Sequence, residues 1–183
     1  MSLLLSDTLV VCDMDNTLLT AKEGLPACNR TVIRLFTEMG GLFTVATGRP
    51  PESIRAALPG ITLSSPAISC NGALLYDFSN NTVLQRSTLN REQATTAILD
   101  VMEHFPRMGV EVMAGDGEMY VVRANETTHA HQVDEQLGSI ACPLENVPDG
   151  WVKVVFAADP ESIRKLSQYT KNRYYGGENY FSH

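Results

Sequence analysis

The chain has 183 residues, of which 44% are hydrophobic and 19% charged, a balance typical of a folded globular protein rather than a disordered one. Its formal net charge of -7 argues against nucleic acid as the main partner, because a phosphate backbone calls for a basic surface. Because no apolar run reaches membrane-spanning length and the apolar stretch at the start is short, we expect neither a membrane span nor a secretory leader.

The four cysteines, Cys12, Cys28, Cys70 and Cys142, are widely spaced and include no C-x-x-C pair. Such spacing favours reduced, partly buried thiols over a disulfide framework or a zinc site. We therefore expect a cytoplasmic protein.

The first predicted element is a strand over residues 8–12, a run of β-branched and apolar residues that indicates burial. Two carboxylates, Asp13 and Asp15, follow with one residue between them, where the strand gives way to a loop. Acidic side chains at the carboxyl end of a strand lie where open α/β sheets bind their ligands. Asp15 and Asn16 are equally typical of a simple turn, and spacing alone leaves both interpretations open.

A helix is expected next, after the chain-breaking stretch 24–26, with Asn29 as its cap and Gly40-Gly41 at its end. Its apolar positions have helical spacing; they are Val32, Ile33, Leu35, Phe36 and Met39. A strand over residues 42–46 follows at once. Strand, helix and strand with short joints predict a parallel crossover unit.

The second strand ends in Thr47-Gly48-Arg49-Pro50. A hydroxyl, a glycine and an arginine at a strand end can hold a phosphoryl oxygen. The alternative is a plain helix start, with Thr47 as cap and the two prolines in the first turn. Each loop alone is ambiguous, but together, on two strands joined by one helix, they suggest a phosphoryl-transfer site.

The remaining elements of the first region are a helix over 51–58, a strand over 66–69 that leads into Asn71-Gly72, and a hairpin. The hairpin strands are expected at 73–77 and 82–85, around the turn residues Asn80-Asn81.

The second region is predicted to alternate helices and strands. Asn90 and Gln93 form a capping box that opens a helix. Further elements are expected at 110–114, 119–122, 126–137 and 151–157, then a helix from Asp159-Pro160 and a last strand or hairpin with Tyr174-Tyr175 and Tyr180-Phe181.

Two patterns in this region resemble metal-binding motifs but favour simpler structures. The stretch 115–118, Gly-Asp-Gly-Glu, lies between two strands and predicts a hairpin turn. His129 and His131 do not share a helix face, which favours a solvated surface over a metal pair.

Three motifs together carry a family resemblance. The stretches 13–19, 46–50 and 69–73 resemble the first two motifs and the following Asn-Gly loop of the haloacid dehalogenase superfamily. Their order and spacing are most similar to the Cof-like phosphatases. Asn16 stands where glycine is more usual, a mild departure because asparagine tolerates a left-handed turn.

The resemblance implies an α/β fold with two domains. Residues 1–79 correspond to the N-terminal part of a Rossmannoid parallel-sheet core, and residues 80–183 to an α/β cap inserted after the second motif. The cap would close over a small phosphorylated metabolite, with a sugar phosphate as the expected class.

The resemblance also implies the chemistry of a Mg²⁺-dependent phosphatase. Asp13 corresponds to the nucleophile that becomes an aspartyl-phosphate, Asp15 to the general acid and base, and Thr47 to a donor to the phosphoryl group. Asp13 and the carbonyl of Asp15 would bind Mg²⁺. The residues expected around the substrate are Gly48, Arg49, Asn71 and Gly72.

The same resemblance predicts a lysine and a second acidic motif after the cap, and neither is found. Lys153, Lys165 and Lys171 fall in the cap-like region and are not assigned the missing role. The chain therefore corresponds to the front part of a family member, and its activity is open. Without the missing strands the first strand would be an apolar sheet edge, which predicts a homo-oligomer.

Two other functions remain open at this stage. The chain could be a non-catalytic phosphate- and Mg²⁺-binding or assembly module, as the missing lysine and acidic motif suggest. Within enzymes, a phosphomutase is the alternative, because the same two aspartates can serve a phosphoryl shuttle.

Overall fold

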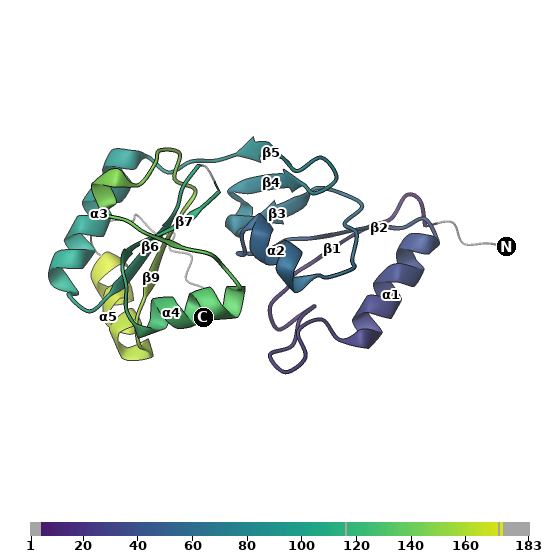
Figure 1. Cartoon of the computed structure of the whole chain (residues 1–183), viewed down its shortest axis with the longest axis horizontal. Coiled ribbons are helices and arrows are strands. Elements are labelled where there is room, and N and C mark those ends of the chain that lie inside the picture. The colour runs from purple at the N-terminus through teal and green to yellow at the C-terminus, as the bar shows by residue number, and fades with distance from the viewer. Residues whose placement is uncertain (1–4, 116, 172, 174–183) are drawn as a thin grey trace. The chain divides into compact units, whose positions relative to one another are not determined.

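A computed structural model describes residues 5–115, 117–171 and 173 and divides the chain into two compact units, Met1–Ser87 and Thr88–His183 (Figure 1). The division follows the hairpin that begins with residue 74, whereas the boundary expected after residue 79 lies in the turn of that hairpin. That the units correspond to a partial core and a cap stays a prediction.

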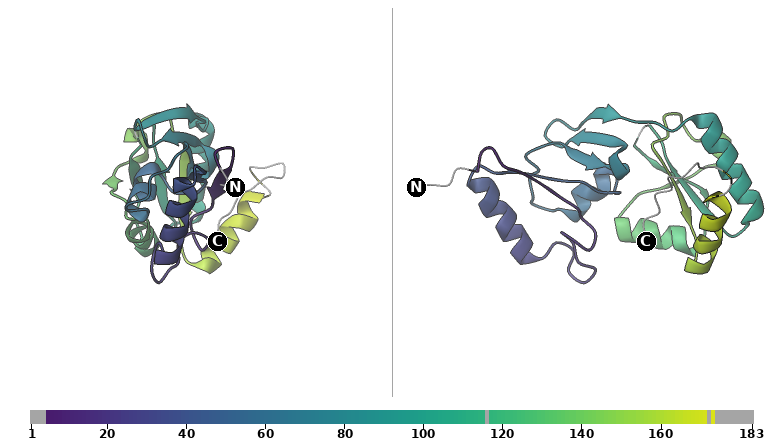
Figure 2. Two further views of the ribbon diagram at one scale, coloured as in Figure 1. Left: turned by 90° about the vertical axis from the view of Figure 1, so that its right-hand side faces the viewer. Right: turned by 180° about the vertical axis from the view of Figure 1, so that it is seen from behind.

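The first unit begins with the predicted parallel crossover. Strand β1 (Leu9–Cys12), helix α1 (Ala27–Glu38) and strand β2 (Leu42–Val45) follow in order, and β1 pairs in parallel with β2. Figures 1 and 2 show α1 running alongside this strand pair. Because Cys12 lies opposite Val45, both strands end at the same edge of the sheet.

The rest of the unit adds a third strand beside the carboxyl end of β2, followed by a hairpin. Helix α2 (Pro51–Ala57) leads to strand β3 (Ala67–Ser69), which a parallel bridge between Ala46 and Ile68 joins to the end of β2. A short 3-10 turn, η1 (Cys70–Gly72), then leads into the antiparallel strands β4 (Leu74–Asp77) and β5 (Thr82–Arg86). The predicted helix, third strand and hairpin are confirmed within a residue or two.

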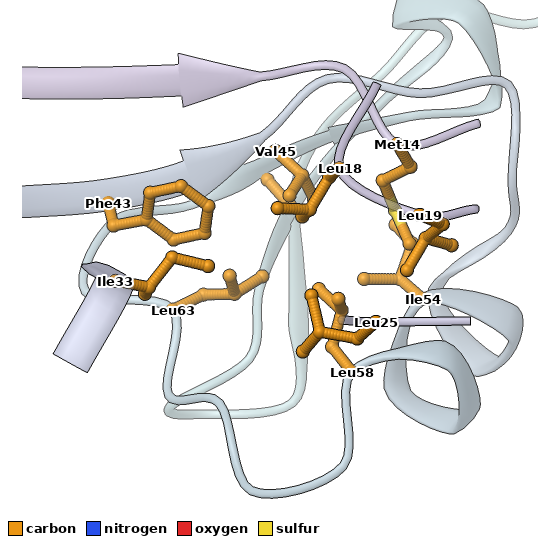
Figure 3. Close-up of a cluster of buried hydrophobic side chains, with 11 residues drawn as sticks. Met14, Leu18, Leu19, Leu25, Ile33, Phe43, Val45, Ile54, Leu58 and Leu63 are labelled. Atoms are coloured by element: carbon orange, nitrogen blue, oxygen red, sulfur yellow. The ribbon is translucent and has the colours of Figure 1, made fainter. Parts of the chain in front are cut away.

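A core of apolar side chains fixes the loop that carries the two aspartates (Figure 3). Met14 is fully buried between the exposed residues Asp13 and Asp15, and Leu18 and Leu19 are buried just after them. They pack with Val45 and Ile54, among others, in one cluster. Since Met14 is buried, its two neighbours are directed outward, and this alternation presents the carboxylates to solvent.

Two predictions for this unit are wrong. Helix α1 begins at Ala27 behind Pro26, so Asn29 lies inside the helix, where its side-chain amide donates to the carbonyl of Leu18 (2.9 Å). Strand β1 is not buried: the exposed fractions of Leu9, Val10 and Val11 are 50%, 39% and 46%. The reason is that β1 lies at the edge of its sheet and pairs with β2 alone among the described strands.

The second unit is a four-stranded sheet with helices on both faces. Its elements are α3 (Arg91–His104), β6 (Gly109–Met113), β7 (Met119–Arg123), α4 (Glu126–Glu135), β8 (Ile140–Ala141), a 3-10 turn η2 (Leu144–Asn146), β9 (Lys153–Ala157) and α5 (Pro160–Lys171). The strand order is β8-β7-β6-β9. All of these elements except β8 and η2 were expected from the sequence, with small shifts of boundary.

Local signals explain several of these elements. Asn90 caps α3 by accepting from the Gln93 backbone N–H (3.0 Å), which confirms the cap of the predicted capping box; the described contacts do not include the reciprocal one from the Gln93 side chain. Asp159 accepts from the backbone N–H groups of Glu161 and Ser162 at the start of α5. Between β6 and β7 the Gly117 N–H donates to the Ala114 carbonyl (3.1 Å), a contact that fits the predicted hairpin turn.

Val110 of β6, Val101 of α3 and Leu166 of α5 are buried on one face of this sheet, whereas Glu111, the next residue along β6, lies on the other face against α4. The right-hand view of Figure 2 shows α3 and α5 together on one side of the strands and α4 on the other. Trp151, the single tryptophan of the chain, is also buried in this unit.

The prediction of a solvated histidine pair is confirmed for His129 and wrong for His131. His129 is exposed. The His131 side chain is 22% exposed and lies against fully buried Glu111, with Nδ1 2.6 Å from Oε2, while its Nε2 lies 3.2 Å from Glu135. The buried carboxylate, 20 residues away in sequence, gives the imidazole a partner that helix periodicity does not show.

Three further predictions can be placed. The last predicted strand, with Tyr174-Tyr175 and Tyr180-Phe181, lies outside the described residues. All four cysteines are free thiols; Cys70 is buried and Cys12 and Cys142 are half-buried, but Cys28 is exposed, against expectation. None of the helices within the described part of the chain combines the length and apolarity needed to cross a membrane.

Candidate active site

The carboxyl ends of β1, β2 and β3 carry the three motifs, and main-chain hydrogen bonds tie their loops together. The Ala46 N–H donates to the carbonyl of Cys12 (2.9 Å), which places Asp13 beside the start of the Thr47 loop. The N–H of Asn71 donates to the Thr47 carbonyl (3.1 Å), and so joins the third loop to the second. The sheet therefore brings together residues 58 positions apart, from Asp13 to Asn71.

The loop that carries Asp13 and Asp15 is a tight turn in which one carbonyl accepts several hydrogen bonds. The N–H groups of Leu18 and Leu19 both donate to the Met14 carbonyl, at 3.0 and 2.8 Å. Asn16 adopts the predicted left-handed conformation, with φ of 57°. The Thr17 hydroxyl donates to Oδ2 of Asp13 (2.9 Å) and so fixes the orientation of that carboxylate.

The neighbouring thiol is not a competing nucleophile. Burial, and secondly the charge of Asp13, raise the pKa of the Cys12 thiol above its ordinary value. The thiol is therefore protonated at neutral pH, and it donates to the Asp13 carbonyl (3.2 Å). Asp13 itself is an exposed carboxylate at the strand end.

Arg49 connects the second motif to the first. Its guanidinium donates to the Asp15 carboxylate from Nη2 (2.8 Å to Oδ1) and from Nε (3.0 Å to Oδ2 and 3.2 Å to Oδ1). Such a two-point contact fixes the plane of the carboxylate as well as its position. The residues 34 positions apart that the sequence pattern placed at one site are thus in direct contact.

Thr47 lies within this arrangement and does not cap the following helix. Its hydroxyl accepts from the Arg49 N–H (3.2 Å), and its residue is 7% exposed. Helix α2 instead begins at Pro51, with Pro50 in the N-cap position, and no side chain caps it. The alternative interpretation of Thr47 as a plain helix cap is therefore wrong.

The third loop is built from residues in left-handed conformations. Cys70, Asn71 and Gly72 have φ of 51°, 58° and 90°, a run that is costly for the two residues that carry a side chain. The Asn71 side chain lies against Gly48, where an added Cβ would come 2.9 Å from Oδ1. Gly48 therefore leaves room for the Asn71 amide, which a side chain at position 48 would displace.

Thr17, Ser53 and Ser69 also belong to this arrangement, although the motifs did not indicate them as site residues. The Ser53 hydroxyl accepts from Nη1 of Arg49 (2.8 Å), and the Ser69 hydroxyl donates to the Arg49 carbonyl (2.7 Å). Thr17 and Ser53 each stand four residues after the group that they contact, a spacing that would have suggested them. Ser69 has no such local signal, because it is 20 residues from Arg49.

The oxygen donors at the site suit a hard divalent cation. The Asp13 carboxylate and main-chain carbonyls of its loop are the ligand types that Mg²⁺ prefers, and Mg²⁺ retains several waters when the protein supplies few ligands. Over the described ranges, no group of three or more His, Cys, Asp or Glu side chains is placed to hold a metal ion.

These features define an α/β protein with a candidate phosphoryl-transfer site at the carboxyl edge of its parallel strands. The family model of the haloacid dehalogenase-like hydrolases matches residues 10–182. The chain belongs to this family, and the resemblance inferred from the three motifs is confirmed.

Two curated relatives are phosphatases. The chain is 33% identical over 95 residues to the pyridoxal phosphate phosphatase of Escherichia coli, a match that covers 52% of this chain and 35% of that protein. It is 30% identical over 93 residues to a 5-amino-6-(5-phospho-D-ribitylamino)uracil phosphatase of Bacillus subtilis, covering 51% and 31%. The chain thus spans about a third of the length of the curated relatives it matches.

Solved structures show the same fold. A haloacid dehalogenase-like hydrolase from Bacteroides thetaiotaomicron superposes with a TM-score of 0.80 at 16% identity, covering 96% of this chain and 67% of that one. A second, from Bacillus subtilis, has a TM-score of 0.70 at 19% identity and covers 91% and 67%. The predicted α/β fold class is confirmed.

Proposed function

We propose that the chain carries the phosphoryl-transfer residues of a phosphatase that hydrolyses a monoester of a small phosphorylated metabolite. The observation that supports this most strongly is the Arg49–Asp15 contact, because it joins the two motifs at the strand ends. The family match and the two phosphatase relatives support the reaction class.

In the first step, an oxygen of Asp13 attacks phosphorus and the bond from phosphorus to the ester oxygen breaks. The leaving oxygen keeps the electron pair and takes a proton from Asp15. In the second step, Asp15 accepts a proton from water, whose oxygen attacks phosphorus, and the Asp13 carboxylate leaves. Asp15 ends protonated for the next turnover, so protons and charges balance.

The remaining site residues surround the phosphoryl group in this proposal. Thr47 donates to a phosphoryl oxygen, and Gly48, Asn71 and Gly72 form the loop wall around it. The Asp13 carboxylate and the Asp15 carbonyl would hold Mg²⁺, which would supply positive charge to stabilise the transferred phosphoryl group.

For the substrate we propose a sugar phosphate or sugar-alcohol phosphate. One relative is named for a substrate that carries a phosphorylated ribityl group, and another for pyridoxal phosphate. Both names describe small monoesters. The free thiols also support a reducing, cytoplasmic location, and the net charge of -7 favours small-molecule partners over nucleic acid.

The test compares Asp13→Asn with wild type in the hydrolysis of a generic phosphate ester with Mg²⁺. The substitution keeps the size of the side chain but replaces the carboxylate with a neutral amide, whose oxygen is a poor nucleophile, so turnover should be abolished. Asp134→Asn, an exposed change on α4, is the control and should keep wild-type turnover. Unchanged turnover in Asp13→Asn would reject Asp13 as the nucleophile.

A second candidate is a non-catalytic module that binds Mg²⁺ and phosphate. The described residues support it in one respect, because they contain no larger cluster of acidic side chains at the site. Binding of Mg²⁺ or inorganic phosphate without turnover by the wild-type chain would favour this candidate.

We also propose that the chain associates with itself through the edge of β1. Leu9, Val10 and Val11 are all at least 39% exposed, and an exposed apolar edge strand is a template for pairing with another strand. A stable monomer in light scattering would contradict this proposal.

A further inference from the structure

Arg49 is held by contacts to both its side chain and its main chain, and these contacts point away from a simple role in binding phosphate. Its side chain is 12% exposed. The Nε–Nη2 edge of the guanidinium faces Asp15, and Nη1 donates to the hydroxyl of Ser53 (2.8 Å). In these contacts the guanidinium therefore faces the Asp15 carboxylate and the Ser53 hydroxyl.

The main chain of Arg49 is held as firmly as its side chain. Its carbonyl accepts from the Ser69 hydroxyl (2.7 Å) and from the Cys70 N–H (3.2 Å), and its own N–H donates to the Thr47 hydroxyl. A shift of Arg49 towards solvent would break contacts to both neighbouring loops. The geometry favours a fixed element over one that swings to a ligand.

Asp15, in contrast, is half exposed, with a side-chain exposed fraction of 51%. An exposed aspartate samples several rotamers unless a partner holds it. Its Oδ1 accepts from both Nη2 and Nε, whereas in the described contacts its Oδ2 accepts from Nε alone. Oδ2 is therefore the oxygen best placed to exchange a proton.

Ser53 completes this chain of contacts. It is fully buried in the first turn of α2, four residues after Arg49, and its hydroxyl accepts from the guanidinium. Ser53 touches neither Asp15 nor any reacting atom in the proposed mechanism, so its effect on chemistry must pass through Arg49.

We propose that Ser53 is a positioning residue, which through Arg49 sets the orientation of the Asp15 carboxylate for proton transfer to the leaving group. The inference rests on the proposed phosphatase function and refines the role of Arg49, which positions the acid instead of binding the substrate. Because a bidentate guanidinium fixes the plane of a carboxylate, loss of the Ser53 hydroxyl loosens that plane.

The kinetic test exploits the leaving group. A simple alkyl phosphate has a poor leaving group that needs a proton, whereas 2,4-dinitrophenyl phosphate has a good one that does not. General acid catalysis contributes about 10²–10⁴-fold, so partial misalignment in Ser53→Ala should slow the alkyl phosphate by about 10-fold and the dinitrophenyl ester by less than about 2-fold. Ser53→Thr keeps the hydroxyl and should restore the alkyl rate.

Two controls separate positioning from stability. Asp15→Asn should also slow the alkyl phosphate more than the dinitrophenyl ester, and by a larger factor than Ser53→Ala does. Ser64→Ala removes a hydroxyl bonded to the Phe43 main chain, at the other end of β2, and should show no dependence on the leaving group. Equal slowing of both esters by Ser53→Ala, or no slowing, overturns the inference, whereas a wild-type chain that hydrolyses neither ester counts against the proposed function instead.

If the wild-type chain hydrolyses neither ester, a measurement that needs no turnover tests the inference. The Nε–H proton of Arg49 can be followed by ¹⁵N-resolved NMR, and its exchange with water should be slow in wild type. Asp15→Asn and Ser53→Ala should each speed this exchange about 10-fold or more, and Ser53→Thr should not. Arg55, an exposed residue of α2, is the internal reference. Equal exchange in wild type and Ser53→Ala would overturn the inference.

Discussion

Replacing His131 by glutamine should remove most of the pH dependence of the second unit's stability above neutral pH. The imidazole lies 2.6 Å from the fully buried Glu111 carboxylate and 3.2 Å from Glu135, which is 15% exposed. Hydrogen bonds to Glu111 first and Glu135 second raise the pKa of His131 from 6.5 to about 9. His131 is therefore an imidazolium at neutral pH, held between two carboxylates.

The size of the effect follows from that shift. A rise of about 2.5 pH units at about 1.4 kcal/mol each corresponds to about 3 kcal/mol, and partial exposure of the side chain reduces this to about 2–3 kcal/mol. The folded-state pKa is raised, so the stabilisation is fully present below about pH 6.5 and is lost as the pH rises through about 9. The free energy of unfolding should fall by that amount over this interval.

Trp151 makes the assay specific. It is the single tryptophan and is buried in the second unit, so its fluorescence during urea unfolding reports on this unit. Unfolding curves at about pH 6 and about pH 10 give the loss of stability in wild type and in His131→Gln. The variant carries all other titrating groups, including Tyr169 and Lys165, whose pKa values are also raised, and so serves as the reference for them.

Two results would refute this reasoning. One is an equal change of unfolding free energy with pH in wild type and in His131→Gln. The other is a His131→Ala variant that loses less than about 1 kcal/mol at neutral pH, because an unpaired buried carboxylate should cost about 3–5 kcal/mol. Combining His131→Gln with Glu111→Gln removes that charge and should recover part of the loss, which a double-mutant cycle measures.

Further predictions concern the packing of the second unit and the edge of the first. Gly109→Ala should cost about 1–3 kcal/mol in tryptophan-monitored unfolding, because its Cβ would lie 2.4 Å from a methyl group of Thr128; Gly138→Ala, with no heavy atom within 4 Å, is the control and should be neutral. Asn125→Ala should cost about 2 kcal/mol in the same assay, since the side chain caps α4 and also donates to two carbonyls; an unchanged urea midpoint would contradict this. Val11→Lys should shift the chain towards monomer in light scattering, and an unchanged mass would count against the β1 edge as the interface.

The sequence predicted those parts of the fold whose causes are local. Short continuous apolar runs predicted β1 and β2, helical spacing predicted α1, and the tolerance of asparagine for a left-handed conformation predicted the turn at Asn16. The convergence of Asp15 and Arg49 also followed, because the carboxyl ends of parallel strands share one edge.

The predictions that failed depend on contacts between residues distant in sequence. Asn29 has a good capping side chain, but the Leu18 carbonyl takes its amide and the helix starts earlier. His131 was expected to be exposed to solvent, but it contacts Glu111, which lies on another element and 20 residues away in sequence. The strand β1 has a buried composition, yet its outer edge has no partner among the described strands, and composition cannot show this.

The central claim is that Asp13 receives the phosphoryl group. The most direct measurement incubates the chain with Mg²⁺ and a reactive phosphate donor, quenches with acid, reduces any aspartyl-phosphate with borohydride, and locates the reduced residue by peptide mass spectrometry. We expect the label at Asp13 in wild type and none in Asp13→Asn. A label at Asp15 or elsewhere, or turnover without a label at Asp13, would contradict the account.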